Sequence, residues 1–193
     1  SERVPYTIAK ADPERGTLTM VIQEVGRSST KLCDLKVGDE VADIVGPLGT
    51  PSHIENYGTV VCAGDGIGIA AILPILTALK KAGNRVISVL AGRTKELVIM
   101  VDDVKEYSDE VIIMTDDGSY GIRGNVSVVI KEFDTVFNAI YSCGAPGMMK
   151  YINQTFYDHP RAYLSLESRM ACGMGACYAC VLKVPDSDTV SQR

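Results

Sequence analysis

Five short apolar segments follow one another through the middle of the chain, separated by stretches with helical spacing or by glycine-rich loops. Continuous apolar segments of this length are typical of strands that are buried on both faces of a parallel sheet. Strands that alternate with helices predict a doubly wound α/β domain with helices on both faces. We expect the strands at residues 59–63, 85–91, 111–115, 136–142 and 162–166, and the helices at about 67–82, 97–104, 126–133 and 147–157.

A glycine-rich loop joins the first of these strands to the first helix, with the sequence Gly64-Asp65-Gly66-Ile67-Gly68. Small residues let the backbone approach a pyrophosphate, and the N-terminus of a helix offers N–H groups and a positive dipole end. We therefore predict that Gly64, Gly66 and Gly68 bind a dinucleotide. A tight turn that binds no ligand has a similar sequence, so this alternative stays open.

Cys143 and Gly144 end the fourth predicted strand. In an open parallel sheet, ligands bind outside the carboxyl ends of the strands, where the strand order reverses. This position predicts that Cys143 and Gly144 flank a nicotinamide ring. The other interpretation is a buried thiol at a strand end, followed by a turn.

The first 52 residues read as β structure, with strands expected at 3–9, 17–23 and 41–45. Two or three strands cannot close a barrel, so we expect the chain to be a fragment of a longer protein. Arg3, Tyr6 and Thr7 offer a cation for a phosphate, an aromatic ring for stacking and a hydroxyl, although a surface arginine on a strand looks the same. The segment 26–30 reads as a loop that opens a short helix, which is a second phosphate-capable N-terminus.

Three cysteines near the C-terminus have the spacing C-x4-C-x2-C, at Cys172, Cys177 and Cys180. This is the spacing of the first three ligands of a plant-type 2Fe-2S cluster. The small residues between them let the backbone close on the cluster and direct N–H groups at its sulfur atoms. Structural zinc and inert buried thiols are the alternatives, and zinc usually needs four ligands. We expect the fourth cysteine ligand to lie beyond Arg193.

Charge and composition exclude several classes of protein. The formal net charge is −5, which argues against a surface that binds nucleic acid. The longest apolar run, at residues 67–79, is too short and too interrupted to cross a bilayer. Six cysteines without the spacing of a disulfide scaffold suit a reducing compartment, so we expect a cytoplasmic protein. No Ser-His-Asp order or carboxylate pair is present, so no catalytic side chain is predicted.

The order of these parts resembles the ferredoxin-NADP reductase superfamily. The segment 165–177 is similar to the cluster loop of the iron-sulfur flavoprotein subunit of type B dihydroorotate dehydrogenase. The segments 2–7 and 46–53 look closer to a sibling family, the small subunit of NADH-dependent ferredoxin:NADP oxidoreductase, also described as sulfide dehydrogenase. The resemblance implies a partial antiparallel FAD-binding barrel at 1–52, an NAD(P)-binding α/β domain at 53–160 and a 2Fe-2S region at 161–193.

The resemblance also implies roles for individual residues. Arg3 would lie at the FAD phosphates, Tyr6 against the isoalloxazine and Thr7 near its N5 atom. The FAD pyrophosphate would be held by Gly26, Ser29 and Thr30. The nicotinamide nucleotide would be lined by Gly64, Gly66, Gly68, Cys143 and Gly144. At the position of Asp65, where this chain has a carboxylate, a glycine usually serves a phosphate.

The function that the resemblance implies is that of an oxidoreductase subunit in a hetero-oligomer. Electrons would move between NAD(P)H, FAD and a 2Fe-2S cluster, and on to or from a dihydroorotate-oxidising flavoprotein of pyrimidine biosynthesis. One alternative is the small subunit of a bifurcating NADH-dependent ferredoxin:NADP oxidoreductase, and another is a stand-alone reductase. A non-catalytic module stapled by a metal is the alternative of a different class.

Overall fold

The computed structural model describes residues 3–131, 136–167, 170–183 and 190–192. Contacts between residues divide the chain into two compact units. Unit 1 comprises residues 1–6, 21–52 and 168–193, and unit 2 comprises residues 7–20 and 53–167. The predicted division into a flavin segment, a dinucleotide domain and a cluster region groups residues by expected function, and it stays a prediction.

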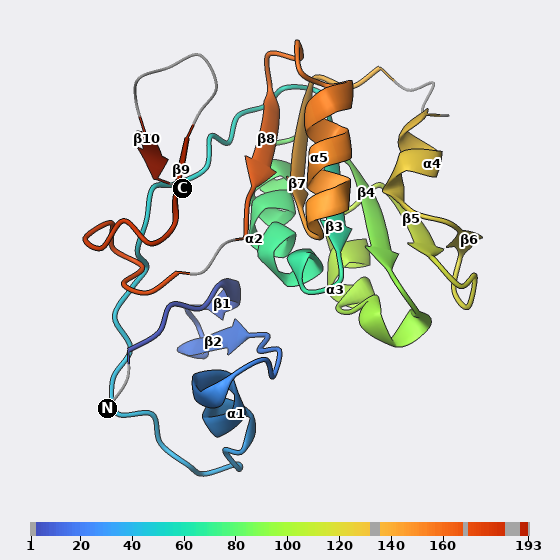
Figure 1. The fold of residues 1–193 in the computed structure, drawn as a ribbon. Helices are drawn as coiled ribbons and strands as arrows, with labels where there is room; N and C mark the ends of the chain where they lie inside the picture. The colour runs from blue at the N-terminus through green and yellow to red at the C-terminus, as the bar shows by residue number, and fades with distance from the viewer. Residues whose placement is uncertain (1–2, 132–135, 168–169, 184–189, 193) are drawn as a thin grey trace. The chain divides into compact units, whose positions relative to one another are not determined.

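Unit 2 is built on a six-stranded sheet in which all neighbouring strands are parallel. The strand order is β6-β5-β4-β3-β7-β8, and β3 lies in the middle (Figure 1). The strands are β3 (Thr59–Asp65), β4 (Arg85–Gly92), β5 (Glu110–Thr115), β6 (Ile122–Arg123), β7 (Ala139–Cys143) and β8 (Ala162–Ser165). The five predicted strands are confirmed, and β6 adds a short edge strand from a second glycine-rich loop, at residues 116–124.

Helices cover both faces of this sheet, as the continuous apolar strands predict (Figure 1). Alternate residues of β3 show it directly, because Val60 packs with α2 and α3 while Val61 packs with α4 and α5. The doubly wound fold is therefore confirmed. The helices of unit 2 are α2 (Gly68–Lys81), the 3-10 helix η1 (Lys95–Leu97), α3 (Val101–Glu106), α4 (Val126–Lys131) and α5 (Pro146–Thr155).

One predicted helix differs from the structure in detail. The helix expected over 97–104 is divided into η1 and α3, because Met100 has a left-handed backbone with φ 53° that no continuous α-helix contains. The helix α2 runs through Pro74 without a break, and this proline lies on its exposed side. The last part of the helix predicted over 126–133 falls outside the described residues.

An antiparallel hairpin of β1 (Ile8–Asp12) and β2 (Thr17–Met20) completes unit 2. The strand β1 packs against α2, and Lys10 forms a salt bridge of 2.5 Å with Asp103 on α3. Contacts thus place the hairpin with the α/β domain, although it lies within the segment expected to form the flavin barrel. The strand predicted at residues 3–9 begins only at Ile8, and the strand predicted at 17–23 ends at Met20.

Unit 1 contains the helix α1 (Arg27–Cys33) and the antiparallel pair β9 (Val181–Lys183) and β10 (Val190–Gln192). The short helix predicted after Gly26 is confirmed. The strand predicted at residues 41–45 is wrong. Val41, Ile44 and Val45 are 50%, 60% and 57% exposed and pair with no other strand of the described residues, so no ladder of hydrogen bonds stabilises an extended segment there.

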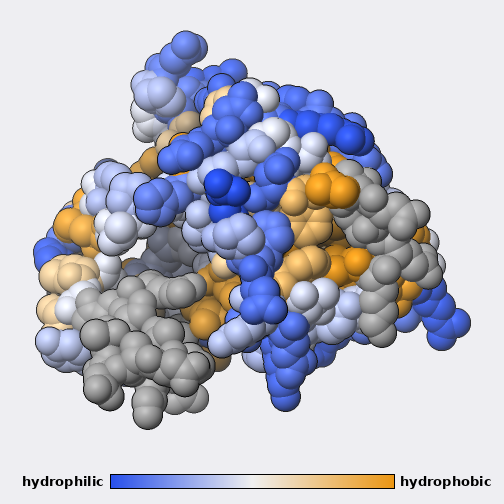
Figure 2. Space-filling view, turned by 90° about the horizontal axis from the view of Figure 1, so that it is seen from above, coloured by the Kyte–Doolittle hydropathy of each residue, from blue (hydrophilic) through white to orange (hydrophobic). Residues whose placement is uncertain are grey.

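The surface is mixed in character. Hydrophilic side chains cover much of the face seen in Figure 2, and hydrophobic ones gather there in separate patches. Within the described ranges, no helix is both long and apolar enough to cross a membrane.

Candidate functional site

The point where the strand order reverses lies between β3 and β7. From β3 the chain continues to β4 and β5 on one side, and it later returns to β7 on the other side. Gly64 at the end of β3 is in register with Cys143 at the end of β7. The two loops that sequence analysis selected therefore leave the sheet side by side. This is the position at which doubly wound sheets bind ligands.

Three glycines of the first loop have different structural roles. A Cβ atom on Gly68 would lie 2.2 Å from the carbonyl oxygen of Cys143, and one on Gly64 would lie 2.9 Å from the Cα of Ile69. These two positions require glycine for close packing. Gly66 has a left-handed backbone, with φ 56°, and open space where a side chain would point. The loop thus presents bare backbone at Gly66 and packs tightly on either side.

Hydrogen bonds decide which N–H groups of the loop can meet a ligand. The N–H of Gly66 donates to the carbonyl oxygen of Ala91 at 2.9 Å, so it fixes the loop to β4. The N–H groups of Ile67 and Gly68 have no hydrogen-bond partner among the described residues. They lie at the N-terminus of α2, whose dipole favours an anion. This arrangement is suited to a pyrophosphate.

The thiol of Cys143 is fully buried and lies 3.4 Å from a carboxylate oxygen of Glu167. Burial, followed by the negative charge of Glu167, raises the pKa of Cys143 to about 12. The thiol is therefore protonated at neutral pH and donates to the carboxylate. Sequence analysis missed Glu167, although a signal was available: it follows β8 by two residues, and β8 lies beside β7 with the same direction.

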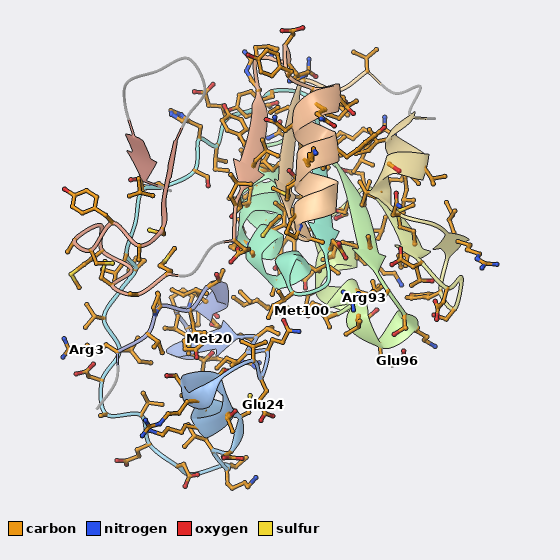
Figure 3. The ribbon with its side chains drawn as sticks, in the orientation of Figure 1. Arg3, Met20, Glu24, Arg93, Glu96 and Met100 are labelled. Atoms are coloured by element: carbon orange, nitrogen blue, oxygen red, sulfur yellow. The ribbon has the colours of Figure 1, made fainter. Side chains whose placement is uncertain are left out.

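Arg93 lies at the same edge of the sheet, directly after β4 (Figure 3). Its carbonyl oxygen accepts a hydrogen bond from the N–H of Asp117 at 3.3 Å, and the N–H of Asp116 donates to Gly92 at 3.1 Å. The loops after β4 and β5 are thus joined by backbone hydrogen bonds. Arg93 supplies a positive charge beside the loop after β3.

The residues predicted to contact FAD fall in both units. Arg3 is exposed and forms a salt bridge of 2.8 Å with Asp43 in unit 1. Tyr6 is half-buried in unit 1, whereas Thr7 is exposed and belongs to unit 2. The structure therefore does not place Thr7 relative to Arg3, and the roles of these residues stay predictions.

The residues predicted to hold the FAD pyrophosphate meet at the start of α1. The hydroxyl of Ser29 accepts from the N–H groups of Val25 and Gly26 at 2.9 and 3.0 Å and donates to the Gly26 carbonyl. The hydroxyl of Thr30 donates to Glu24 at 3.0 Å. Ser29 thus caps its own helix, which fixes the turn that brings Gly26 and Thr30 together.

The cysteine loop directs backbone N–H groups at one of its sulfurs. The N–H of Ala176 donates to the Cys172 sulfur at 3.3 Å. Hydrogen bonds from the backbone of Met174, Cys177 and Ala176 lower the pKa of Cys172 to about 6, which favours the thiolate that binds metals. The thiol of Cys177 also bonds to it.

The backbone of this loop is shaped for close wrapping. Gly173 and Gly175 have φ 67° and 80°, and a Cβ atom on Gly173 would lie 2.9 Å from Pro5. The described residues do not gather three His, Cys, Asp or Glu side chains into one metal-ion site, and the contact between cluster thiols that the structure shows is the one between Cys172 and Cys177. The donor set and the N–H groups directed at sulfur fit an iron-sulfur cluster, and the ligand assignment stays a prediction.

Two features define the class of this protein: a doubly wound sheet with a glycine loop at its switch point, and a cysteine loop with 2Fe-2S spacing. Both are typical of a dinucleotide-binding oxidoreductase that carries an iron-sulfur cluster.

Comparison with known proteins agrees with this class. The family model described as the iron-sulfur cluster binding domain of dihydroorotate dehydrogenase B matches residues 167–193. The electron transfer subunit of dihydroorotate dehydrogenase B (NAD(+)) from Streptococcus pneumoniae R6 is 50% identical over 194 residues, which cover 99% of this chain and 75% of the relative. Its homologue from Thermotoga maritima is 43% identical over 187 residues, with 95% and 66% covered.

A solved structure of NADH-dependent reduced ferredoxin-NADP oxidoreductase, studied for flavin-based electron bifurcation, is also similar. It has a TM-score of 0.84 and 41% identity, and the match covers 93% of this chain and 66% of that chain. The chain belongs to the family of the electron transfer subunits of dihydroorotate dehydrogenase B. The resemblance inferred from the sequence is confirmed, both for this family and for its sibling.

Proposed function

We propose that this chain carries electrons between a nicotinamide dinucleotide and a partner flavoprotein that oxidises dihydroorotate, as a subunit of a hetero-oligomer of pyrimidine biosynthesis. The observation that carries the proposal is the 50% identity to an electron transfer subunit along nearly the whole chain. The match of residues 167–193 to a cluster-binding domain supports the metal assignment. The six free thiols suit the reducing cytoplasm, which is the compartment we propose.

Each unit contributes a different binding role. In unit 2, the N–H groups of Ile67 and Gly68 bind the pyrophosphate at the N-terminus of α2, and Cys143 with Gly144 lines the nicotinamide. Burial keeps the Cys143 thiol protonated, so this thiol adds no negative charge beside the ring. The carboxylate of Glu167 fixes the direction of this thiol through the bond of 3.4 Å.

In unit 1, Arg3, Tyr6 and the turn at Gly26 bind FAD. Cys172, Cys177 and Cys180 hold the two irons as thiolates. When bound, the flavin supplies the change from two-electron to one-electron transfer, and the cluster supplies a one-electron carrier. The N–H groups directed at Cys172 stabilise negative charge on sulfur, which tunes the potential of a cluster held there.

The second candidate is the small subunit of a bifurcating NADH-dependent ferredoxin:NADP oxidoreductase. The structural similarity at a TM-score of 0.84 favours it. The partner distinguishes the two functions, because the bifurcating enzyme needs a partner with low-potential iron-sulfur clusters. Co-purification of the full-length protein from its own cells and analysis of the partner's iron and flavin content decides between them.

The direct test is purification of the full-length protein without oxygen, followed by measurement of flavin, iron and acid-labile sulfide. We expect all three, and we expect NADH to bleach the flavin absorbance. Bleaching by neither NADH nor NADPH would contradict the proposal. Zinc without flavin or sulfide would support the metal-stapled module, and turnover with a dye in the absence of any partner would support a stand-alone reductase.

A further inference from the structure

Asp65 is the one charged residue inside the glycine loop at the switch point. Its backbone and Cβ lie against the second loop, since a Cβ atom on Gly144 would come within 2.6 Å of the Asp65 Cβ and 3.0 Å of its nitrogen. The carboxylate is about half-buried. Asp65 therefore lies between the loop that we assign to the pyrophosphate and the loop that we assign to the nicotinamide.

The carboxylate of Asp65 has a structural partner in the second loop. The backbone N–H of Ala145, which is the N-cap residue of α5, is close enough to this carboxylate to lower its pKa. In a capping box, a side chain three residues into the helix accepts this N–H. That position in α5 is Met148, which cannot accept it, and no side chain of α5 caps its N-terminus. Asp65, the last residue of β3, takes the place of this missing acceptor.

Charged groups at the ends of β4 and β5 face the same carboxylate. Burial has the largest effect and raises the pKa of Asp65 above its ordinary value. The N–H of Ala145 lowers this pKa, Asp116 raises it, and Arg93 lowers it. Burial therefore makes the ionised form of Asp65 less favourable in free energy. A further negative charge nearby makes that form less favourable still.

We propose that Asp65 is a positioning residue that holds the β7–α5 loop by capping α5, and that its negative charge opposes the dinucleotide pyrophosphate, so that dinucleotide binding is accompanied by proton uptake at Asp65. This inference rests on the proposed binding of a dinucleotide at Ile67 and Gly68. The two residues directly follow Asp65 and Gly66 in the same loop, so the pyrophosphate and the carboxylate share one short segment of chain.

Proton uptake follows because the bound pyrophosphate and the ionised carboxylate of Asp65 repel each other. Two negative charges bound beside a carboxylate raise its pKa further, so the complex binds more protons than the free protein. Affinity for the dinucleotide then rises as the pH falls toward the pKa of Asp65. A loop with glycine in place of Asp65 would not show this dependence of affinity on pH, because it would contain no titratable side chain.

Calorimetric titration of the full-length protein with NADH tests the inference. Runs in two buffers of different ionisation enthalpy, at several values between about pH 5 and pH 8, give the number of protons taken up. We expect uptake by the wild type that grows as the pH falls across this range. The Asp65→Asn variant keeps an oxygen for Ala145 and loses the charge, so it should bind NADH about 3- to 10-fold more tightly and take up no proton.

Two further variants provide controls. Asp158→Asn also removes one negative charge. Asp158 precedes β8 and so lies at the amino ends of the parallel strands, away from the two loops. This variant should leave proton uptake and NADH affinity unchanged. Asp116→Asn removes the neighbour that raises the pKa of Asp65, so it should move the uptake to lower pH. This variant decides the question if Asp65→Asn does not fold.

The outcomes separate the inference from the proposed function. Binding of NADH without proton uptake in the wild type, or equal uptake in Asp65→Asn, overturns the role of Asp65 and leaves the dinucleotide site intact. No heat with NADH in any folded variant overturns both, because the site itself would then be absent. Uptake that follows Asp158 in place of Asp65 also overturns the inference.

Discussion

Gly68 and Cys143 meet so closely that no side chain fits between them. A Cβ atom on Gly68 would lie 2.2 Å from the carbonyl oxygen of Cys143 and 2.6 Å from its carbonyl carbon. The obstacle is backbone of β7, which cannot move away as the end of a flexible side chain would. This contact joins the first turn of α2 to the end of β7, and it sets the spacing of the two loops at the switch point.

Replacing this glycine should therefore damage both the fold and the site. We expect Gly68→Ala to destabilise the protein by about 2 kcal/mol, because overpacking of a tight contact forces the backbone to shift. Binding of NADH should weaken as the loop moves. Gly147→Ala is the matched control in the first turn of α5, since no atom lies within 4 Å of its added Cβ. Urea unfolding of both variants measures the difference, and equal stability of the two would contradict the prediction.

Asn84 joins the segment 55–58 to the last turn of α2 through its buried amide. Its oxygen accepts from the N–H of Tyr57 at 2.7 Å and from Gly58 at 3.2 Å, and its nitrogen donates to the carbonyls of Glu55 and Leu79 at 2.8 Å each. We expect Asn84→Ala to cost about 2–3 kcal/mol, because one buried and three partly buried backbone groups lose a hydrogen-bond partner. The exposed Asn56→Ala should cost less than about 1 kcal/mol. Denaturant midpoints of the two variants check this, and a reversed order would refute it.

The carboxylate of Asp109 gives the stability a dependence on pH. A hydrogen bond from Lys80 at 2.6 Å and one from the N–H of Val86 at 2.8 Å lower its pKa from 3.8. Its stabilisation is therefore present above the unfolded pKa and is lost as the pH falls through the lower folded pKa. Because the pair is partly exposed, we expect Asp109→Asn to cost only about 0.5–1 kcal/mol near neutral pH.

This difference between wild type and Asp109→Asn should shrink as the pH falls through the lowered folded pKa of Asp109, because protonation then removes the charge that Lys80 and Val86 stabilise. Unfolding in urea at neutral pH and at several acidic pH values measures it. Asp102→Asn is the control, because Asp102 is fully exposed and lies 3.9 Å from Lys105. A gap that persists unchanged in acid would show that the charge of Asp109 does not stabilise the fold.

Loss of a cluster thiolate should remove iron without unfolding unit 2. We expect Cys172→Ser to lower the iron and sulfide content of anaerobically purified protein several-fold, because serine is a poor ligand for these metals. Cys33→Ser is the control, since this thiol is exposed on α1 and contacts only the carbonyl of Ile22 at 3.9 Å among the hydrogen bonds described. Full iron content in Cys172→Ser would exclude it as a ligand.

The α/β domain could be predicted because its sequence pattern is local. Runs such as Val60–Ala63 are apolar at every position, since both faces of β3 are buried, and glycines mark the turns that follow. The segment 41–45 has a similar apolar content, and the prediction of a strand there was wrong. A strand needs a neighbour to complete its hydrogen bonds, and no local pattern reveals whether that neighbour exists.

The sequence by itself determined the order of the parallel strands along the chain, the glycine loop, and the thiols with 2Fe-2S spacing, because each depends on residues close together in the chain. Only the tertiary structure decided that Glu167 meets Cys143, that Asp65 lies against Gly144, and that the N–H of Gly66 donates to the carbonyl oxygen of Ala91. These contacts join the ends of neighbouring strands that lie up to about 80 residues apart, and their geometry follows from the register of the sheet.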